Sequence, residues 1–312
     1  MSDHSASVVV IGSINSDLTI TVDRHPHPGE TLIGYGGTHG PGGKGANQAL
    51  AARLAGAKTA FIGAVGDDAQ AEHATALLRR WGVTLDALAT VPGPTGLAVV
   101  IVDAAGENTI TVVPGANGVV SVDLVEQHQS LIAGAEVTIA QCEIPTEALT
   151  VAAGLTRGRF ILNLAPVTDI PLAILRRADP LVVNEHEARG LLSQLDTDGM
   201  QTDAEDIAAG IRRHGVPSVV ITFGPLGAMV ADESGTSKVP SESVDVVDTT
   251  GAGDAFVGTL GARLAAGDNL RSATVLACRA GGLATTALGA QNSYTTTLSG
   301  LCHPLNPDPR VR

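Results

Sequence analysis

The sequence predicts an α/β fold, in which a three-layer α/β/α domain holds a mostly parallel central sheet and carries a small additional β-sheet. Short, continuous aliphatic runs alternate along the chain with longer segments of helical pattern. Runs without alternating polar residues are typical of strands covered on both faces, as in a parallel sheet between helices. The repeated strand–helix–strand order is the second observation, and it indicates the same layered arrangement.

Six buried strands alternate with helices in this prediction. The strands are expected at residues 8–11, 60–65, 137–140, 160–164, 181–183 and 219–223. The helices are expected at residues 46–55, 69–81, 123–133, 147–153, 185–192, 202–214, 255–266 and 270–283. No internal repeat or long linker divides the chain, so we expect residues 1–312 to form one domain.

Two regions depart from this pattern and predict the small sheet. Residues 18–22 with 31–38, and residues 97–102 with 108–113, look like antiparallel pairs because no helical crossover separates the members of either pair. The second pair alternates and is joined by a plausible hairpin loop. We therefore expect a small sheet built from two insertions, at about 17–40 and about 96–115.

The composition excludes several classes of protein. The chain of 312 residues has 19 Lys and Arg against 32 Asp and Glu, a net charge of −13, and 44% apolar residues. An apolar content this high is not that of a disordered chain. The acidic balance argues against a nucleic-acid or membrane-surface partner, because few cations are present to neutralise phosphate groups.

The distribution of apolar and sulfur-containing residues bears on location. No apolar run approaches the roughly 18 residues of a membrane span, and the first residues lack the basic segment of a signal peptide. Cys142, Cys278 and Cys302 form no CxxC motif and no disulfide framework, which suits a reducing compartment. We therefore expect a cytoplasmic protein.

Polar residues follow most of the predicted strands. Ligands of parallel α/β sheets bind beyond the carboxyl ends of the strands, and a rim of carboxylates and amides suits sugar hydroxyls or Mg²⁺. Any one of these residues could instead cap a helix or shape a turn. The residues are Asn15, Asp17, Asp67, Asp68, Glu143, Asn163, Asn184, Glu187, Thr222 and Gly224.

The first glycine-rich segment is Gly-Pro-Gly-Gly-Lys-Gly-Ala-Asn at 40–47. It is not a Walker A loop, because Thr38 and Gly45 stand where that motif needs Gly and Ser or Thr. It satisfies G-x-G-x-x-G literally, but no buried strand precedes it, which disfavours a dinucleotide site. A helix-entry loop without a ligand is a second alternative. The pattern favours close backbone approach to a ligand, with Lys44 and Asn47 near it.

The second glycine-rich segment, Asp-Thr-Thr-Gly-Ala-Gly-Asp at 248–254, leads into a predicted helix. Gly251 and Gly253 leave backbone N–H groups free at the helix N-terminus, which suits an anion. Asp254, in the first turn, could merely cap the helix. A carboxylate beside an anion site makes chemical sense if a phosphoryl group arrives there and the carboxylate deprotonates the attacking hydroxyl.

Together the two segments resemble the two signatures of the ribokinase-like (PfkB) carbohydrate kinase family. The resemblance runs from Val8 to about Ser293, and Glu143 and the segments 12–17, 28–31, 43–49, 66–68 and 115–117 share it. It implies ATP-dependent phosphorylation of D-ribose at the 5-hydroxyl, giving ribose 5-phosphate. Asp254 would be the general base, and the backbone of Gly251, Ala252 and Gly253 the anion hole.

The resemblance also implies which residues bind the substrates. The sugar would be held by Asn15, Asp17, Gly42, Gly43, Lys44, Asn47 and Glu143, beside Asp254. The nucleotide side would be lined by Asn184, Glu187, Thr222, Gly224, Gly227 and Gly253, with Asn184 and Glu187 organising Mg²⁺. The small sheet would be a lid over the sugar, and in bacterial members it makes a homodimer contact.

Members of the family are commonly activated by K⁺. Residues at the expected positions of its ligands, mostly backbone carbonyls, are Asp248, Thr250, Ala284, Ala287, Gly289 and Ser293. The sequence departs from the family pattern in three places. Pro41 precedes the Gly-Gly pair, Pro225 removes a backbone donor in the nucleotide loop, and no proline follows residues 289–291, where 292–296 is Asn-Ser-Tyr-Thr-Thr.

Alternatives remain at this point. The same chemistry could act on 2-deoxyribose, a ketohexose or a nucleoside, although a nucleoside needs aromatic surface and the two insertions offer only Tyr35. A non-catalytic sugar sensor would be expected to have lost Asp254 or its neighbouring glycines. An NAD-dependent oxidoreductase is disfavoured by the lack of a buried strand before Gly40.

Overall fold

The computed structural model of the protein describes residues 6–195, 203–299 and 301. A nine-stranded sheet forms its centre, in the order β13-β12-β11-β10-β9-β8-β1-β4-β5. Neighbouring strands from β11 to β5 are parallel, and β12 and β13 are antiparallel additions at one edge. The strands are β1 (Val8–Ile11), β4 (Thr59–Gly66), β5 (Thr84–Val91), β8 (Val137–Gln141), β9 (Arg159–Asn163), β10 (Ala178–Asn184), β11 (Val219–Thr222), β12 (Ala228–Asp232) and β13 (Gly235–Val239).

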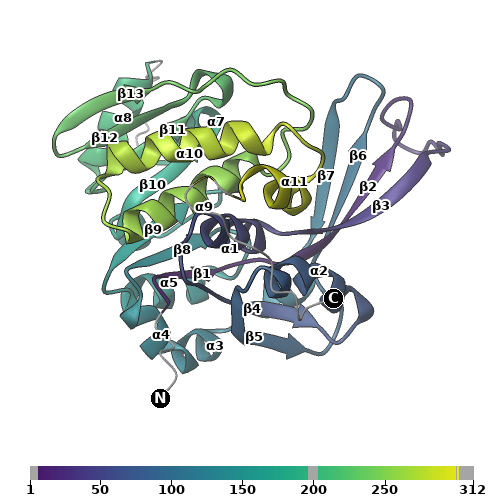
Figure 1. The fold of residues 1–312 in the computed structure, drawn as a ribbon, viewed down its shortest axis with the longest axis horizontal. Helices are drawn as coiled ribbons and strands as arrows, with labels where there is room; N and C mark the ends of the chain where they lie inside the picture. Colours follow the sequence, from purple (N-terminus) through teal and green to yellow (C-terminus); the bar gives the residue numbers. More distant parts are fainter. Residues whose placement is uncertain (1–5, 196–202, 300, 302–312) are drawn as a thin grey trace.

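Helices cover both faces of this sheet, so the predicted three-layer architecture is confirmed (Figure 1). Along β1, Val8 and Val10 belong to the core on one face, and Val9 and Ile11 to the core on the other. The first face is covered by α1 (Lys44–Leu54), α2 (Ala69–Arg80), α9 (Ala252–Ala265), α10 (Leu270–Ala284) and α11 (Ala290–Thr297). The second is covered by α3 (Val122–Gln127), α4 (Gln129–Gly134), α5 (Thr146–Leu155), α6 (Leu172–Leu175), α7 (Glu185–Leu195) and α8 (Ala204–Arg213).

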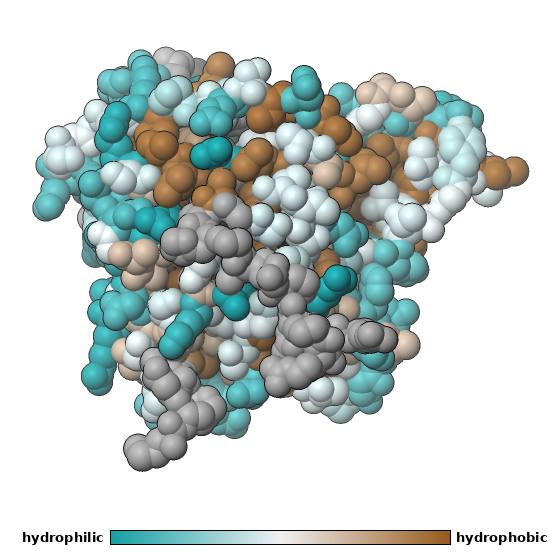
Figure 2. All heavy atoms as spheres, viewed as in Figure 1, coloured by the Kyte–Doolittle hydropathy of each residue, from teal (hydrophilic) through white to brown (hydrophobic). Residues whose placement is uncertain are grey.

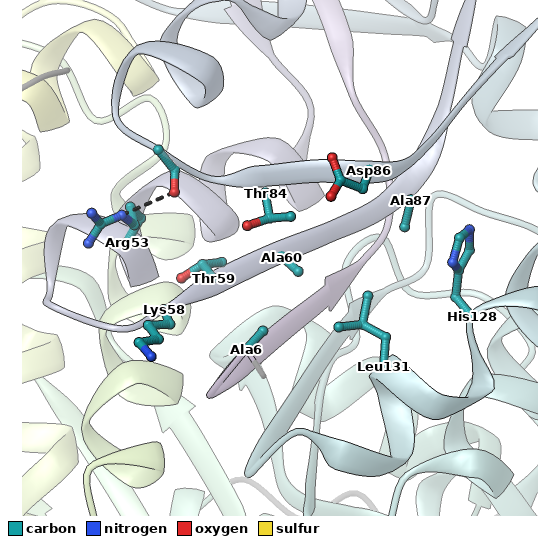
Figure 3. Close-up of a pocket in the computed structure, with 11 residues that line it drawn as sticks. Ala6, Arg53, Lys58, Thr59, Ala60, Thr84, Asp86, Ala87, His128 and Leu131 are labelled. Atoms are coloured by element: carbon teal, nitrogen blue, oxygen red, sulfur yellow. Dashed lines mark hydrogen bonds between the residues drawn. The ribbon is translucent and has the colours of Figure 1, made fainter. Parts of the chain in front are cut away.

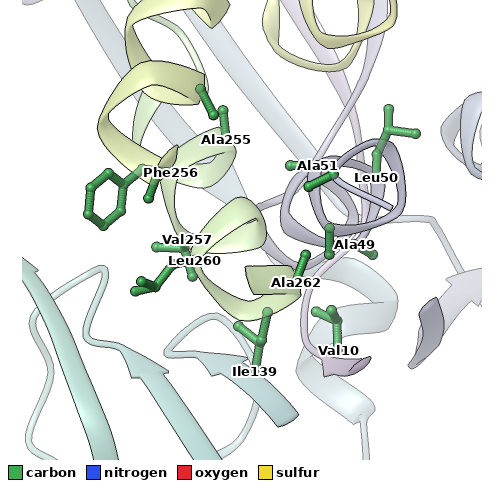
Figure 4. Close-up of a cluster of buried hydrophobic side chains, with 14 of the residues drawn as sticks. Val10, Ala49, Leu50, Ala51, Ile139, Ala255, Phe256, Val257, Leu260 and Ala262 are labelled. Carbon is green, nitrogen blue, oxygen red and sulfur yellow. The ribbon is translucent and has the colours of Figure 1, made fainter. Parts of the chain in front are cut away.

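Helices α1 and α9 contact each other through small residues, which explains the high alanine and glycine content of these segments. A Cβ at Gly258 would lie 2.3 Å from the Gln48 carbonyl oxygen and 2.7 Å from Ala51 Cβ. Figure 4 shows alanines of both helices in this contact, together with Val10 and Ile139 of the sheet. Because the backbones approach so closely, polar side chains at the N-terminal ends of the two helices can meet.

The predicted small sheet is present, with the strand order β3-β2-β6-β7. It projects from the side of the molecule (Figure 1) and consists of β2 (Asn15–Thr21), β3 (Tyr35–Gly42), β6 (Leu97–Val102) and β7 (Asn108–Val113). The β2–β3 and β6–β7 pairs are antiparallel, and β2 and β6 pair in parallel.

The prediction at β3 is wrong in its limits. Residues 31–34 are not in the strand, which starts at Tyr35 and continues to Gly42. The first half of the expected glycine-rich loop is therefore paired backbone, with Pro41 opposite Ser16 and Gly42 opposite Asn15. Only Gly43 separates the strand from α1, which begins at Lys44 rather than Ala46.

Other differences have local causes. The helix expected at 123–133 is two helices, because the backbone at His128 (φ −105°, ψ 19°) leaves helical geometry. Helix α9 begins at Ala252, three residues earlier than expected. The sequence predicted no element at β5, β12, β13, α6 or α11. β5 and β13 have mixed sequences and α11 is mostly polar, whereas α6 and β12 are apolar but only four and five residues long. Cys302, and Thr202 at the predicted start of α8, lie outside the described residues.

Within residues 6–195, 203–299 and 301, no helix is both long and apolar enough to cross a bilayer.

Candidate active site

Two adjoining cavities lie at the carboxyl ends of the parallel strands. The smaller, of about 180 Å³, is lined by residues from α1, β10, α7, β11 and α9, among them Lys44, Asn184, Glu187, Thr222, Gly251, Gly253 and Asp254. The larger, of about 460 Å³, is lined by Thr222, Gly224, Gly227 and Gly253 together with residues 241–244, Val246, Phe256 and Cys278. Thr222, Gly253 and Phe256 line both cavities. Residues that the sequence assigned to a sugar side and a nucleotide side therefore meet at one place.

Asp254 lies buried at this junction, in the first turn of α9. It does not cap its own helix; its Oδ2 accepts from Asn47 Nδ2 at 2.9 Å and its Oδ1 from Gln48 Nε2 at 2.8 Å. The capping alternative is therefore wrong. Burial raises the pKa of Asp254 above its ordinary value, against the opposing effects of Lys44 and the two amides. A carboxylate with a raised pKa and a neighbouring cation is suited to accept a proton.

Four carboxylates act on Lys44, from β2, the turn after β8, α7 and α9. Burial alone would lower the pKa of its ammonium, but the charges of Asp254, Glu143, Glu187 and Asp17 outweigh it and the pKa is raised. Lys44 therefore stays charged, and its positive charge acts on the carboxylate of Asp254.

Asp17 and Glu143 are two further carboxylates close to Lys44, and the charges of Glu143 and Asp254 both act on Asp17. Burial, reinforced by the charge of Glu143, raises the pKa of Asp17 to about 7. Its Oδ1 is buried without a hydrogen-bond partner. Glu143 Oε2 accepts from Ser13 Oγ at 2.5 Å and from the Lys44 backbone N–H at 3.4 Å. Because a buried acceptor without a partner is costly, Asp17 Oδ1 is suited to receive a hydroxyl from a ligand.

The glycines before α1 are required by close contacts within the protein. A Cβ at Gly42 would lie 1.9 Å from Asp17 Oδ2. Gly43 has a φ of 88°, and a Cβ there would lie 2.7 Å from the Ile14 Cα. The sequence predicted close backbone approach to a ligand; the approach that the structure shows is to Asp17 and β2.

Asn15 is held by Asn117, which lies in the segment 115–117 that resembles the family pattern but had no predicted role. Asn117 Nδ2 donates to Asn15 Oδ1 at 2.8 Å, and Asn117 Oδ1 accepts from the Ile14 N–H at 2.9 Å. This leaves the Asn15 amide nitrogen as its donor toward a ligand. Asp67 and Asp68, which the sequence placed on the rim, instead bind residues 93–95.

Asn184 and Glu187 form a reciprocal cap at the start of α7. The Asn184 N–H donates to Glu187 Oε2 at 2.7 Å, and the Glu187 N–H donates to Asn184 Oδ1 at 2.8 Å. Burial raises the pKa of Glu187, although Asn184 and Lys44 oppose the rise. The Asn-x-x-Glu pattern therefore has a structural role, and Glu187 also lines the smaller cavity.

The predicted anion hole is the N-terminus of α9. Gly251 is its N-cap, with a left-handed φ of 77° that favours glycine. The carbonyl oxygen of Gly251 accepts from Tyr294 Oη at 2.5 Å, so a residue of α11 holds the backbone of the loop that precedes α9. The Ala252 N–H donates to the Thr249 carbonyl at 3.2 Å, whereas Gly253 lines both cavities.

Five of the six predicted K⁺ ligands are connected by hydrogen bonds. Asp248 accepts from Thr250 N at 2.9 Å, from Thr250 Oγ1 at 2.7 Å and from Gly289 N at 2.8 Å. Ser293 Oγ donates to the Ala284 carbonyl at 2.5 Å. Burial would raise the pKa of Asp248, but the hydrogen bonds from Thr250 and Gly289 outweigh it and the pKa is lowered. In the part of the chain that the structure describes, no three His, Cys, Asp or Glu gather as a metal site, so carbonyls and hydroxyls would have to supply most ligands here.

Sequence reasoning missed a set of buried amides behind Asp254. Gln48 Nε2 donates to Asn163 Oδ1 at 2.9 Å, and Gln141 Nε2 donates to Gln48 Oε1 at 2.6 Å. Gln291 Nε2 donates to Asn47 Oδ1 at 3.0 Å. The sequence offered one sign of this set, the glutamine Gln48 directly after Asn47. The residues that bond to Gln48 and Asn47 come from β8, β9 and α11, and no local sequence pattern marks them.

A further cavity, of about 400 Å³, lies at the opposite, amino ends of β1, β4 and β5 (Figure 3). Figure 3 shows Arg53 and Lys58 at one end of it and Asp86 and His128 at the other, with Thr59 and Thr84 between them. None of the predicted site residues lines it. The candidate active site is therefore at the carboxyl ends of the strands.

Comparisons of sequence with known proteins give one family. The pfkB family carbohydrate kinase profile matches residues 5–297. The chain is 35% identical over 304 residues to a ribokinase of Schizosaccharomyces pombe, covering 94% of this chain and 96% of that protein. It is 36% identical over 298 residues to a bifunctional ribokinase/ribose-5-phosphate isomerase A of Fructilactobacillus sanfranciscensis, of which it spans only 54%. It is also 30% identical over 296 residues to a deoxyribokinase of Salmonella typhi, covering 92% of this chain and 95% of that protein.

Solved structures agree with the sequence comparisons. A ribokinase of Thermotoga maritima aligns with a TM-score of 0.87 at 30% identity, over 95% of this chain and 99% of that one. A ribokinase of Arabidopsis thaliana complexed with ribose and ATP aligns with a TM-score of 0.83 at 30% identity, over 96% and 99% of the two chains. The chain therefore belongs to the pfkB family of carbohydrate kinases, and it is an ATP-dependent sugar kinase of the ribokinase type.

Proposed function

We propose that the protein phosphorylates D-ribose at the 5-hydroxyl with ATP, giving ribose 5-phosphate and ADP. The observation that carries this proposal is the position of the Asp254 carboxylate, beside Lys44 in a cavity that adjoins the larger one through Thr222 and Gly253. The similarity to the ribokinase of Schizosaccharomyces pombe supports ribose as the acceptor. The structure of the Arabidopsis ribokinase, which was solved with ribose and ATP, supports both substrates.

In the proposed reaction, Asp254 accepts the proton of the sugar's primary hydroxyl as its oxygen attacks the γ-phosphorus. The new O–P bond forms while the bond from the γ-phosphorus to the bridging oxygen breaks, and ADP leaves. Charge on the transferred group is stabilised by the N-terminus of α9 at 251–253, which presents backbone dipoles. Lys44 remains charged among the carboxylates and supplies a further positive charge nearby.

The sugar hydroxyls bind between β2 and α1 in this proposal. Asp17 offers the unpartnered Oδ1, and Asn15 offers its amide nitrogen because Asn117 occupies its oxygen. Glu143 is anchored by Ser13 and lies near Asp17. Asn47 Nδ2 donates to Asp254 and Asn47 Oδ1 accepts from Gln291, so the second N–H of Asn47 Nδ2 is what a sugar hydroxyl can use. Gly42 and Gly43 give these groups room.

The nucleotide occupies the larger cavity in this proposal. Its walls combine the backbone of Gly224 and Gly227 with apolar side chains such as Val244, Val246 and Phe256, which suits an adenine base and its ribose. Mg²⁺ accompanies ATP and neutralises phosphate charge when it is bound. The residues that fit this ion are Asn184 and Glu187, because their side-chain oxygens are suitable metal ligands and both residues line the smaller cavity. Asn184 also pairs with Thr222, which lines both cavities.

A K⁺ ion is proposed beside the Asp248–Thr250 turn, where it would fix the loop that precedes α9. One hydrogen bond joins Gly289 to Asp248 of this loop, and a separate one joins Ser293 to Ala284. Ala287 lies between α10 and α11 and is the remaining proposed ligand. Exchanging Na⁺ for K⁺ at constant ionic strength should raise the rate, and an unchanged rate would remove the ion from the proposal.

The small sheet is proposed to close over the sugar and to form a homodimer. Its strands expose Tyr35, Ile110, Val112 and Val113 to solvent, and Figure 2 shows apolar surface extending toward this side of the molecule. Burying such side chains between two copies is favourable. Sedimentation of an Ile110→Asp variant tests this contact, and an unchanged mass would exclude it. The single-domain organisation of residues 1–312 and the cytoplasmic location stay predictions.

The choice of sugar is tested by measuring ADP release with ribose, 2-deoxyribose, fructose and adenosine under identical conditions. We expect the highest kcat/KM with ribose. The similarity to a deoxyribokinase makes 2-deoxyribose the competing substrate. A higher kcat/KM with deoxyribose would replace the acceptor and keep the chemistry, and release at the background rate with all four compounds would contradict the proposed reaction.

A further inference from the structure

A continuous chain of buried amides runs through the proposed base. Starting at β8, Gln141 donates to Gln48, which donates to Asp254 Oδ1. From the other side, α11 contributes Gln291, which donates to Asn47, and Asn47 donates to Asp254 Oδ2. Gln48, Gln141 and Gln291 have no exposed surface, and Asn47 and Asp254 are buried as well.

We propose that Gln48 and Gln291 are positioning residues, which direct amide donors onto both oxygens of Asp254 and so hold its carboxylate for proton removal. The proposal rests on Asp254 being the general base, as proposed above. Gln48 touches Asp254 itself, and Gln291 acts through Asn47.

The directions of the hydrogen bonds give the outer glutamines their role. Gln291 presents its N–H group to Asn47 Oδ1, which turns Asn47 Nδ2 toward the carboxylate. Gln141 presents its N–H group to Gln48 Oε1 and turns Gln48 Nε2 the same way. If either inner amide were reversed, an amide oxygen would face the carboxylate and repel it. An amide has its donor and acceptor on separate atoms, so a partner on the oxygen fixes which atom faces the base.

The unpartnered oxygens of the outer amides support this assignment. Gln141 Oε1 and Gln291 Oε1 are both buried without a hydrogen-bond partner. Such acceptors lower stability, and each side chain nevertheless keeps its N–H group toward the inner amide. Gln48 has an additional constraint, because Asn163 donates to the Val182 carbonyl and thereby presents its Oδ1 to Gln48.

The ionisation of Asp254 gives the experiment its readout. The charge of Lys44 in α1 acts on Asp254, and the charge of Asp254 in turn raises the pKa values of Asp17 in β2, Glu187 in α7 and Tyr294 in α11. Donors from Asn47 and Gln48 oppose the effect of burial on Asp254. Removing a donor therefore makes ionisation harder, and the acid limb of the kcat profile moves to higher pH.

The test compares Gln48→Met and Gln291→Met, which keep the side-chain length and remove the donor. For Gln48→Met we expect the acid limb of kcat to shift upward by about one pH unit, with a smaller shift in the same direction for Gln291→Met. The KM for the sugar should change less than kcat in both. Thr296→Val, on the exposed side of α11 where the hydroxyl bonds only its own helix, is the matched control and should keep the wild-type profile.

Two outcomes separate this proposal from the one on which it rests. If both Met variants have the wild-type pH profile while Asp254→Asn is inactive, the positioning role is wrong and the base role stands. If Asp254→Asn keeps near-normal turnover, the base role itself fails. Gln48→Glu keeps the shape but brings a second carboxylate to Asp254, so it should shift the acid limb further than Gln48→Met; a smaller shift would also overturn the proposal.

Discussion

The carboxylate of Asp17 occupies the space that a side chain at Gly42 would need. The two residues lie on neighbouring strands of the small sheet, β2 and β3, and a Cβ at position 42 would come 1.9 Å from Asp17 Oδ2 and 2.3 Å from its Cγ. The glycine thus allows a buried acid to lie against the backbone beside the proposed sugar site. Asp17 in turn is held with one oxygen that has no partner in the protein.

Gly42→Ala should weaken sugar binding without removing a chemical group from the site. The added methyl group must displace the Asp17 carboxylate, and overpacking of this kind costs about 1–3 kcal/mol. We expect the KM for the sugar to rise about tenfold or more, with a smaller change in the KM for ATP. Gly40→Ala is the matched control, because a Cβ there meets no atom within 4 Å. Equal effects of the two substitutions on the sugar KM would contradict this view of Gly42.

Asp254→Asn should abolish phosphoryl transfer and leave sugar binding largely intact. The amide keeps the shape of the carboxylate but cannot accept the proton, and general base catalysis contributes about 10² to 10⁴-fold in rate. Calorimetric titration with ribose and a coupled ADP assay separate the two effects. Turnover within a few-fold of the wild type would exclude Asp254 as the base.

Much of the fold could be predicted because local patterns determine it. The aliphatic runs of β1 and β4 and the hairpin of β6 and β7 have patterns of their own within a few residues. β5 and β13 are the two edge strands of the sheet and have mixed sequences with several exposed residues, so they offered no such pattern. The eight residues of α11 contain five hydroxyl side chains and little that predicts a helix.

The candidate site was predictable where the chemistry lies in a glycine-rich segment. The sequence assigned Asp254 and Lys44 to one site, and in the structure both line the same cavity. The roles of Gln141 and Gln291 could not be predicted, because each depends on a partner about 90 or more than 200 positions away. The carboxylates Asp67 and Asp68 followed a strand as the others did, but only tertiary packing reveals that they bind a neighbouring loop.

Glu187→Gln should separate the structural role of this residue from a role in binding Mg²⁺. An amide oxygen can still accept from the Asn184 N–H, so the cap of α7 is kept and the melting temperature should change little. The loss of charge should raise the apparent KM for Mg²⁺, by about tenfold if Glu187 acts through water. Glu185→Gln in the same turn, where Glu185 pairs with Arg189, is the control. An unchanged Mg²⁺ dependence in Glu187→Gln would assign the residue to the cap alone.

The pKa of Asp17 predicts how stability depends on pH. In the folded protein this pKa is raised from 3.8 to about 7, mainly by burial. Between these values the unfolded chain releases the proton of Asp17 and the folded chain retains it, so the stability from this group is present at low pH and is lost as pH rises toward 7. Above pH 7 both states are ionised and the destabilisation stays constant.

Asp17→Asn should therefore be more stable than the wild type at pH 8, because it removes a carboxylate that burial disfavours in its charged form. We expect a melting temperature at least about 2 °C higher at pH 8, and a difference that shrinks as pH falls toward 4. The variant should also bind the sugar more weakly, since an amide replaces the unpartnered acceptor. Asp23→Asn, on an exposed loop after β2, controls for the change in net charge. An unchanged or lower melting temperature for Asp17→Asn at pH 8, relative to the wild type, would contradict this prediction. It would mean that favourable interactions of the ionised Asp17 with its neighbours outweigh the free-energy cost of burying its charge.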